Sequence, residues 1–265
     1  MRCLFAILVI LLFPLWLIAD VRSDEKAGEG ANRLTPAGPA IVSGISSAEG
    51  LDRRNDSGIL GLSNDFESIP NSELSLRLFV TPEDPSIQTL AVQTNGAGDA
   101  YEIAAQWIYV SDEVLNHTID KWLTPHEFLT NTPDYSSNPL QGKAVSDCEE
   151  KANALVSLIR AKGIFPEEVR VVLGEVAFNN IKTGHAWIEL LIDGRWLVLD
   201  PSWGPYWDDR VEKLINRRSN PFDYYARHTY PVVQVWAYYN DIYYQNPKSG
   251  LGNAPDSWRI TAPFK

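Results

Sequence analysis

The amino-acid sequence predicts an α+β fold, with mostly helices before residue 163 and mostly strands after it. Residues 146–163 show the apolar spacing and the terminal residues of a helix, and residues 169–178 form a valine-rich run typical of a strand. Two further apolar runs flank Asp193-Gly194, a dipeptide that favours a two-residue β-hairpin turn. Alternation over residues 233–237 predicts a late strand. With 45% hydrophobic and 22% charged residues among 265, the composition is that of a globular protein.

The amino-terminal residues differ in character from this core. Arg2 precedes an unbroken apolar run over residues 4–19, which Asp20 ends. The run is short for a membrane-spanning helix, which needs about 20 residues, and suits a secretory signal peptide or a short anchor. We therefore expect residues 1–23 to be a signal peptide or an N-terminal membrane anchor, with residues 4–19 as the tether if they are retained. The rest of the chain is then extracytoplasmic.

A linker is expected between this segment and the folded domain. Residues 24–72 carry seven of the 17 glycines, with many Ser, Asn and Asp residues and no apolar periodicity, which predicts a flexible linker. The folded domain is then residues 73–265. Without residues 1–23 the chain has 21 basic and 33 acidic residues. Because a phosphate backbone requires a basic surface, we expect no nucleic-acid partner.

Three short elements are expected at the start of the domain. Alternating apolar residues over 74–80 predict a half-buried strand. A helix follows, with Asp99 as its N-cap and Glu102 completing a capping box. Thr124 and Glu127 form a second capping box, with a proline at the first helical position, and predict another short helix.

Cys148 opens the helix expected over residues 146–163. Ser146 and Glu149 fit the S-x-x-E capping box, which makes Ser146 the N-cap and Cys148 the second helical residue. Gly163 suits the residue that follows a helix end. The free N–H groups and the helix dipole at this end stabilise a thiolate. An inert buried cysteine is the alternative, but an unpaired thiol in an oxidising compartment favours a reactive one.

The predicted hairpin places an imidazole and a carboxylate together. A two-residue turn at Asp193-Gly194 pairs residues whose numbers sum to 387, so His185 and Asp200 become diagonal neighbours on one face of the sheet. A hydrogen bond between them is the arrangement that orients the base of an activated nucleophile. Taken singly, each residue fits a structural role, such as an aspartate that opens a turn before proline. Together with Cys148, they predict a catalytic triad.

These motifs resemble those of the transglutaminase-like superfamily. The helix-start cysteine is followed after 37 residues by His185 in "GHAWIEL", and after 15 more by Asp200 in "LVLDPSW". "KWLTPHEFL" and "SDCEEKA" further resemble motifs of the bacterial transglutaminase-like cysteine proteinases, in which glycine stands in place of Ser146 and aspartate in place of Glu150. The resemblance implies a papain-like core, in which the helix that carries the cysteine packs on an antiparallel sheet.

The resemblance also implies roles for the three residues. Cys148 is the nucleophile, His185 the general base and acid, and Asp200 the residue that orients the imidazole. The expected function is that of an extracytoplasmic cysteine peptidase-like enzyme acting on amide bonds of a protein or peptide by acyl transfer, with water as the acceptor. A protein-glutamine acyltransferase shares this chemistry, and a non-catalytic cell-surface binding module on the same fold is the alternative from a different class.

Two acidic residues, Asp147 and Glu149, flank the cysteine. Their negative charges act against a thiolate, so they need an explanation. Helix capping is the favoured interpretation. Calcium is the alternative, because hard oxygen ligands suit it and some of the resembling proteinases bind calcium at the matching positions. The chemistry requires no cofactor.

Overall fold

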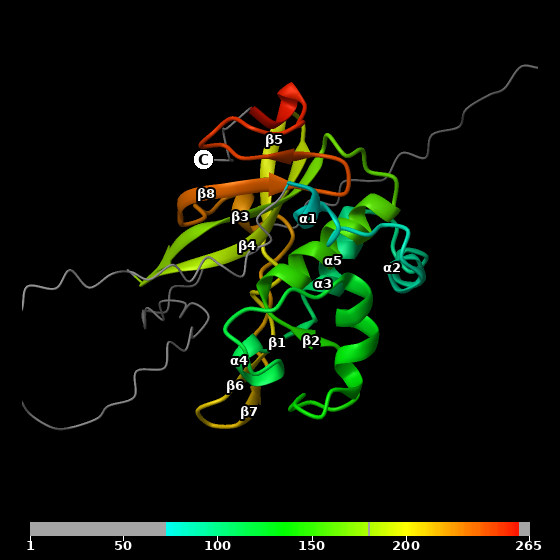
Figure 1. Ribbon diagram of the computed structural model, residues 1–265, viewed down its shortest axis with the longest axis vertical. Coiled ribbons are helices and arrows are strands. Elements are labelled where there is room, and N and C mark those ends of the chain that lie inside the picture. Colours follow the sequence, from blue (N-terminus) through cyan, green and yellow to red (C-terminus); the bar gives the residue numbers. More distant parts are fainter. Residues whose placement is uncertain (1–72, 180, 260–265) are drawn as a thin grey trace, which may run out of the picture. The chain divides into compact units, whose positions relative to one another are not determined.

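A computed structural model describes residues 73–179 and 181–259, and it confirms the α+β class (Figure 1). The helices are α1 (Glu73–Arg77), α2 (Pro85–Ala91), α3 (Ala97–Ala104), α4 (Asp112–Leu115), η1 (Glu127–Asn131), η2 (Thr132–Asp134), α5 (Cys148–Ala161), η3 (Tyr224–Ala226) and η4 (Asp256–Arg259). The strands are β1 (Ile108–Tyr109), β2 (Val145–Ser146), β3 (Val169–Phe178), β4 (Ile181–Ile192), β5 (Arg195–Leu199), β6 (Tyr206–Asp208), β7 (Lys213–Ile215), β8 (Val232–Tyr239) and β9 (Tyr244–Gln245). The expectations for residues 1–23 and 24–72 lie outside the described residues.

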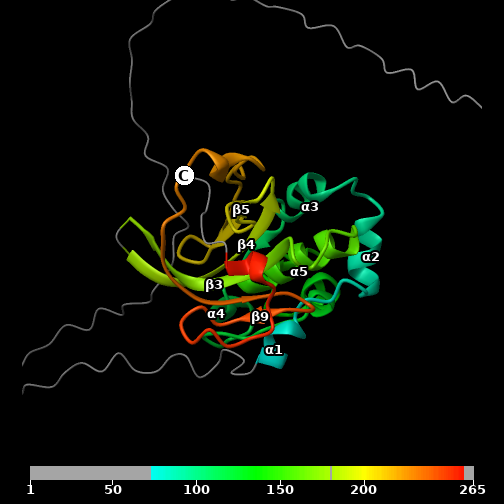
Figure 2. The ribbon, with the colours of Figure 1, turned by 90° about the horizontal axis from the view of Figure 1, so that it is seen from above.

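The strands form two sheets. The larger one has the order β5-β4-β3-β8-β9, and every pairing within it is antiparallel. The smaller one has the order β2-β1-β6-β7 and lies at the end of the molecule near the start of α5 (Figure 1). Figure 2, seen from above, shows α5 alongside β3 and β4 of the larger sheet, with α2 and α3 on its outer side. The helix that carries Cys148 thus packs on an antiparallel sheet, as the resemblance implied.

Helix α5 is buried because its sequence places apolar residues toward both the sheet and the neighbouring helices. Ala152, Leu155, Val156 and Ile159 are all fully buried, in a cluster that also contains residues of α2, α3, β3, β4 and β5. Burying an aliphatic side chain of this size contributes about 1.5–3 kcal/mol. Gly163 follows the helix at φ +84°, which confirms the predicted end of α5.

Aromatic residues cover the opposite face of the larger sheet. Trp187 and Trp196 pack there with tyrosines 225, 230 and 238, and with Trp258 of η4. On this face Arg170 lies 3.8 Å from the ring centroid of Trp196 and donates to Glu189 Oε2 at 2.6 and 2.8 Å. The buried charge of Arg170 is balanced by Glu189. Together with the aromatic cluster, this makes the face a second core of the domain.

Two predictions at the start of the domain are wrong. Residues 73–77 form helix α1 rather than a strand: Leu76 and Val80 are buried at a helical spacing of four, whereas Leu78 is 63% exposed. Asp99 does not cap α3 but lies within its first turn, where its carboxylate accepts from the Asn95 N–H, and the N-cap is Gly96. The capping box at Thr124 and Glu127 is confirmed by hydrogen bonds in both directions.

The hairpin between β4 and β5 has the predicted register. Ile192 pairs with Arg195, and the ladder continues to Ile188 and Leu199. Asp193 and Gly194 have φ values of +51° and +75°, as the turn requires. Residues 181–184, which precede the apolar run that contains His185, also belong to β4 and pair with β3. The β3–β4 hairpin is therefore longer than its sequence pattern indicated.

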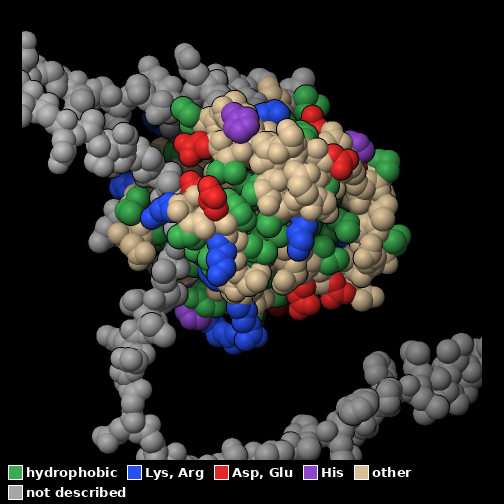
Figure 3. Space-filling model, turned by 90° about the horizontal axis from the view of Figure 1, so that it is seen from below, with side chains coloured by type: hydrophobic (Ala, Val, Ile, Leu, Met, Phe, Trp, Pro, Cys, Tyr) green, Lys and Arg blue, Asp and Glu red, His purple; other side chains and the backbone are tan. Residues whose placement is uncertain are grey.

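The surface seen in Figure 3 is mixed in character. Acidic and basic side chains are interspersed with hydrophobic and uncharged ones on that face. Among the described residues, no helix combines the length and apolarity needed to cross a membrane.

Candidate active site

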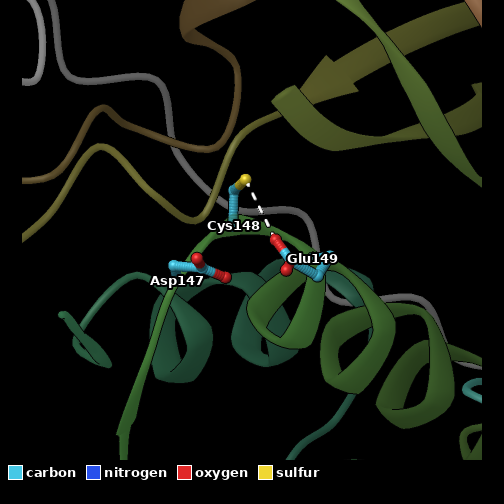
Figure 4. A group of neighbouring side chains, drawn as sticks. All are labelled: Asp147, Cys148 and Glu149. Carbon is cyan, nitrogen blue, oxygen red and sulfur yellow. Dashed lines mark hydrogen bonds between the residues drawn. The ribbon is translucent and has the colours of Figure 1, made fainter. Parts of the chain in front are cut away.

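Cys148 is the first residue of α5, whereas the sequence predicted it as the second, so the helix begins one residue later than predicted. Asp147, not Ser146, is the N-cap, and the Ser146 hydroxyl instead donates to Glu150 Oε2 at 2.9 Å. The predicted S-x-x-E capping box is therefore wrong. Cys148 is unpaired and half-buried, and its Sγ points toward the Glu149 carboxyl, 3.3 Å from Oε2 (Figure 4). Its N–H is one of those that a helix leaves without an intrahelical partner.

His185 and Asp200 form the predicted hydrogen bond. The imidazole Nε2 lies 3.0 Å from Asp200 Oδ2, although the β4–β5 ladder itself ends at Leu199. Asp200 also accepts from the Ser202 N–H at 2.9 Å and from the Tyr230 hydroxyl at 2.8 Å. Burial acts to raise the pKa of Asp200, but the charge of His185 and these hydrogen bonds lower it, so the carboxylate stays ionised.

The electrostatics of His185 link it to both Asp200 and Cys148. Burial alone would lower the pKa of His185, yet the negative charges of Asp200 and Cys148, with the hydrogen bond to Asp200, raise it to about 10. Because Nε2 faces Asp200, Nδ1 is the ring nitrogen left for Cys148. The predicted residues thus lie on α5, on β4 and directly after β5, with His185 hydrogen-bonded to Asp200 and its pKa raised in part by the charge of Cys148.

Packing fixes the imidazole in this position. His185 contacts the rings of Phe178 and Trp187, at centroid distances of 6.2 and 6.4 Å. On the neighbouring strand it pairs with Gly174, where a Cβ atom would lie 2.3 Å from Gln234 O and 2.9 Å from the Trp187 ring. Only glycine allows β3, β4 and β8 to approach so closely at the level of His185.

A group of buried and half-buried carboxylates lies beside the thiol. Asp147, Cys148 and Glu149 each place a potential ligand atom within 4.8 Å of the others, and so do Asp112, Asp120 and Glu149. Burial, with the charge of Asp147, raises the pKa of Asp112 to about 8 and that of Glu149 well above 4.5. The expected capping role of Glu149 is wrong, because its carboxyl meets Cys148 Sγ instead of a backbone N–H. The sequence indicated only the two residues beside the cysteine.

Lys151 is a buried cation that the sequence did not single out. It lies one helical turn after Cys148, is fully buried, and donates from Nζ to Trp107 O at 2.8 Å. Burial lowers its pKa to about 7, although the charges of Asp200 and Cys148 act in the opposite direction. Its position three residues after the cysteine could have indicated that it lies near the site. However, a lysine that follows two glutamates is typical of the exposed face of a helix.

Three residues have side-chain N–H groups of the kind that can serve as an oxyanion donor, and they lie in different environments: Gln141, Trp122 and Trp107. Gln141 donates to Tyr135 O and Asn138 O, so its amide is committed to the loop. Trp122 Nε1 is buried and has no hydrogen-bond partner among the described residues. Trp107 is largely buried, with its ring against Phe128.

Tyr230, whose hydroxyl donates to Asp200, lies 30 residues beyond it, and nothing in the sequence indicated that it belongs to the site.

Comparisons with known proteins agree with the predicted resemblance. Residues 88–201 match the family model of the transglutaminase-like superfamily. No curated protein matched the sequence. Solved structures of Legionella pneumophila LapG are similar at 16% identity and a TM-score of 0.40: the EGTA-treated form covers 68% of this chain and 92% of its own, and the calcium-bound form 68% and 96%. TM-scores of this size assign no role to any residue.

The family-model match includes Cys148, His185 and Asp200. It confirms the resemblance inferred from the motifs, so residues 88–201 form a transglutaminase-like core.

Proposed function

We propose that this chain is an extracytoplasmic cysteine peptidase-like enzyme that cleaves amide bonds of a protein or peptide by acyl transfer. The observation that carries the proposal is the hydrogen bond of 3.0 Å between His185 and Asp200, and the charge of Cys148, which acts to raise the pKa of His185, supports it. Nucleophile, base and orienting group are what covalent amide cleavage needs.

In this mechanism Cys148 Sγ attacks the amide carbon and His185 donates its proton to the leaving amine. The attack forms the S–C bond and places a negative charge on the carbonyl oxygen. The Cys148 N–H, at the start of α5, is suited to stabilise that charge. The C–N bond then breaks, leaving a thioester, and His185 removes a proton from the acceptor that discharges it. Asp200 keeps the imidazole in the tautomer that these transfers require.

Water is the proposed acceptor, because it is the most abundant nucleophile outside a cell. Transfer to an amine, as in a protein-glutamine acyltransferase, uses the same residues and differs only in the group that discharges the thioester. The proposed location rests on the apolar run over residues 4–19, which would tether the enzyme to a membrane if it is not removed.

We also propose that the carboxylates beside Cys148 hold a calcium ion. Asp147 and Glu149 supply hard oxygen atoms, Asp112 and Asp120 add two more, and Asp147 Oδ1 is buried without a hydrogen-bond partner among the described residues. A bound divalent cation would offset the negative charge that these groups place beside the thiolate. Cleavage itself takes place on the side chains of the triad.

Labelling with a thiol-reactive peptide tests the proposal. The purified full-length protein is treated with a peptide electrophile, and the modified residue is located by mass spectrometry. We expect the adduct on Cys148 and a much lower rate in His185→Ala, because the imidazole no longer stabilises the thiolate. Cys3→Ser serves as the control for the second cysteine. Equal labelling of Cys148 with and without His185 would contradict the proposal.

A further inference from the structure

Arg217 lies beside the proposed triad, in the loop that follows β7. Its Nη2 donates to Ser202 O at 3.0 Å, which fixes the guanidinium against the turn that follows Asp200. Its Cζ lies 4.7 Å from the ring centroid of Trp203 and 5.1 Å from that of Tyr206, within cation–π distance of both. These contacts hold the cation in place. The residue is partly exposed.

Among the described residues, no carboxylate forms a salt bridge with this cation, although the charge of Asp200 acts on it from a greater distance. Arg160 pairs with Asp241 at 2.8 Å and Arg170 pairs with Glu189 at 2.6 Å. Within residues 73–179 and 181–259, Arg217 has no ion-pair partner. Burial lowers its pKa, although the charges of Tyr206 and Asp200 act in the opposite direction. Because guanidinium remains charged in proteins, a partly buried arginine without an anion is costly and suggests that the anion comes from outside.

Unused hydrogen-bond donors gather at the same place. Arg217 Nε, Ser202 Oγ and Trp203 Nε1 are buried and have no hydrogen-bond partner among the described residues. Ser202 is itself only 2% exposed. Buried polar atoms are almost always hydrogen-bonded, so an unpaired atom on the cation and two on the residues it contacts indicate a missing acceptor. A carboxylate supplies several acceptor positions and the matching charge, and arginine binds it with two parallel hydrogen bonds.

This group of donors is adjacent to the proposed triad. The Ser202 N–H donates to Asp200 Oδ1 at 2.9 Å. Phe178 joins the two places, because its ring centroid lies 5.6 Å from that of Trp203 and 6.2 Å from that of His185. A group bound by Arg217 would consequently be part of the molecule whose amide bond reaches Cys148.

We infer that Arg217, Ser202 and Trp203 form a carboxylate-binding subsite, so that the substrates are peptides with an acidic side chain or a free C-terminus near the scissile bond. The inference rests on the proposed function and names a substrate class for it. The same donors could instead hold ordered water while Arg217 acts only as a clamp on Ser202 O, and the experiment separates these roles.

The probes are short peptides in which an α,β-unsaturated group replaces the scissile bond, so that residues on both sides can be varied. One arm compares Glu with Gln at each position, and the other compares a free C-terminal carboxylate with its amide. The rate of Cys148 labelling in the full-length protein is measured for wild type, Arg217→Gln and Arg217→Lys. Arg218→Gln is the matched control, since it removes the same charge from an exposed neighbour. Iodoacetamide gives the reactivity of the thiol without a peptide.

Wild type should label at least about tenfold faster with the acidic probe at one position, as expected for a hydrogen bond to a charged group. Arg217→Gln should remove this preference, Arg217→Lys should keep part of it, and Arg218→Gln should leave it intact. Equal rates for acidic and amide probes in wild type would overturn the subsite. A preference for the acidic probe that survives Arg217→Gln, or that is lost equally in Arg218→Gln, would also overturn the subsite. The same holds if Arg217→Gln slows labelling by iodoacetamide and by all peptide probes to the same extent.

The proposed function is tested separately, by turnover of internally quenched peptides in wild type and Cys148→Ser. Acid-selective labelling without any turnover would retain the subsite and reject the peptidase.

Discussion

Replacing Asp200 with asparagine should leave the fold intact and nearly abolish turnover. Asp200 accepts three hydrogen bonds, from His185 and Tyr230 on Oδ2 and from the Ser202 N–H on Oδ1. Asparagine has a single acceptor oxygen, so it must adopt one of two orientations. With the oxygen toward His185, the amide N–H₂ faces the Ser202 N–H, and a buried donor loses its partner at a cost of about 1–3 kcal/mol.

The other orientation keeps every hydrogen bond but changes which nitrogen of the imidazole carries the proton. The oxygen then accepts from the Ser202 N–H, and the amide donates to His185 Nε2 while the Tyr230 hydroxyl rotates to remain bonded. The imidazole proton must move to Nδ1, the nitrogen that faces Cys148, so His185 can no longer accept the thiol proton. This orientation avoids the unpaired donor, and we expect it to dominate.

The expected loss in kcat is about 10⁴-fold, the size seen when the same replacement gives a catalytic histidine the wrong tautomer in another enzyme. The assay measures kcat and KM on a quenched peptide that wild type cleaves, alongside urea unfolding. Asp223→Asn is the control, because it removes the same charge from an exposed ion pair with Arg227. Tyr230→Phe should cost far less than Asp200→Asn, since the carboxylate and the imidazole tautomer remain. Normal turnover in Asp200→Asn, or a loss explained by unfolding, would refute this reasoning.

Three further predictions concern stability and metal binding. Gly174→Ala should destabilise the fold by about 1–3 kcal/mol in urea unfolding, because its Cβ would overlap Gln234 O. Gly184→Ala should change the stability little, since the nearest atom to its Cβ would be 3.4 Å away. Equal effects of the two replacements would contradict the packing described around His185. Since the pKa of His185 is about 10 in the folded state and about 6.5 unfolded, its protonated form stabilises the fold most below pH 6.5, and this contribution is lost as pH rises toward 10. The difference in unfolding free energy between wild type and His185→Gln should therefore narrow between these pH values, and a constant difference would contradict the assignment. Calorimetry of chelator-treated protein should detect calcium binding that Glu149→Gln weakens and the exposed Glu113→Gln does not; absence of heat at millimolar calcium would reject the ion.

The pairing of His185 with Asp200 was predictable because it depends on short-range rules. The turn at Asp193-Gly194 fixes the register of β4 and β5, and that register alone places His185 near Asp200. The start of α5 was placed within one residue of Cys148, because few residue types begin a helix. The error in the capping box is a shift of one position, and it changed the inferred role of Glu149.

The remaining parts of the site depend on contacts between distant segments. Tyr230 reaches Asp200 across 30 residues, and Asp112 joins Glu149 from a separate short helix. Lys151 is buried because α5 is covered by several elements, whereas its own sequence resembles an exposed face. Residues 74–80 misled for a related reason: apolar residues at every second position include the spacing of four that a helix needs, and tertiary packing selected Leu76 and Val80.

The central claim is that Cys148 forms a covalent acyl intermediate, and rapid-quench mass spectrometry tests it most directly. The full-length protein is mixed with an activated ester of a blocked amino acid, and the mass and position of any adduct are measured over time. The account predicts a thioester on Cys148 that water discharges, slower discharge in Asp200→Asn, and no adduct at this position in Cys148→Ala. An adduct only on another residue, or hydrolysis of the ester that is equally fast in Cys148→Ala, would contradict the claim.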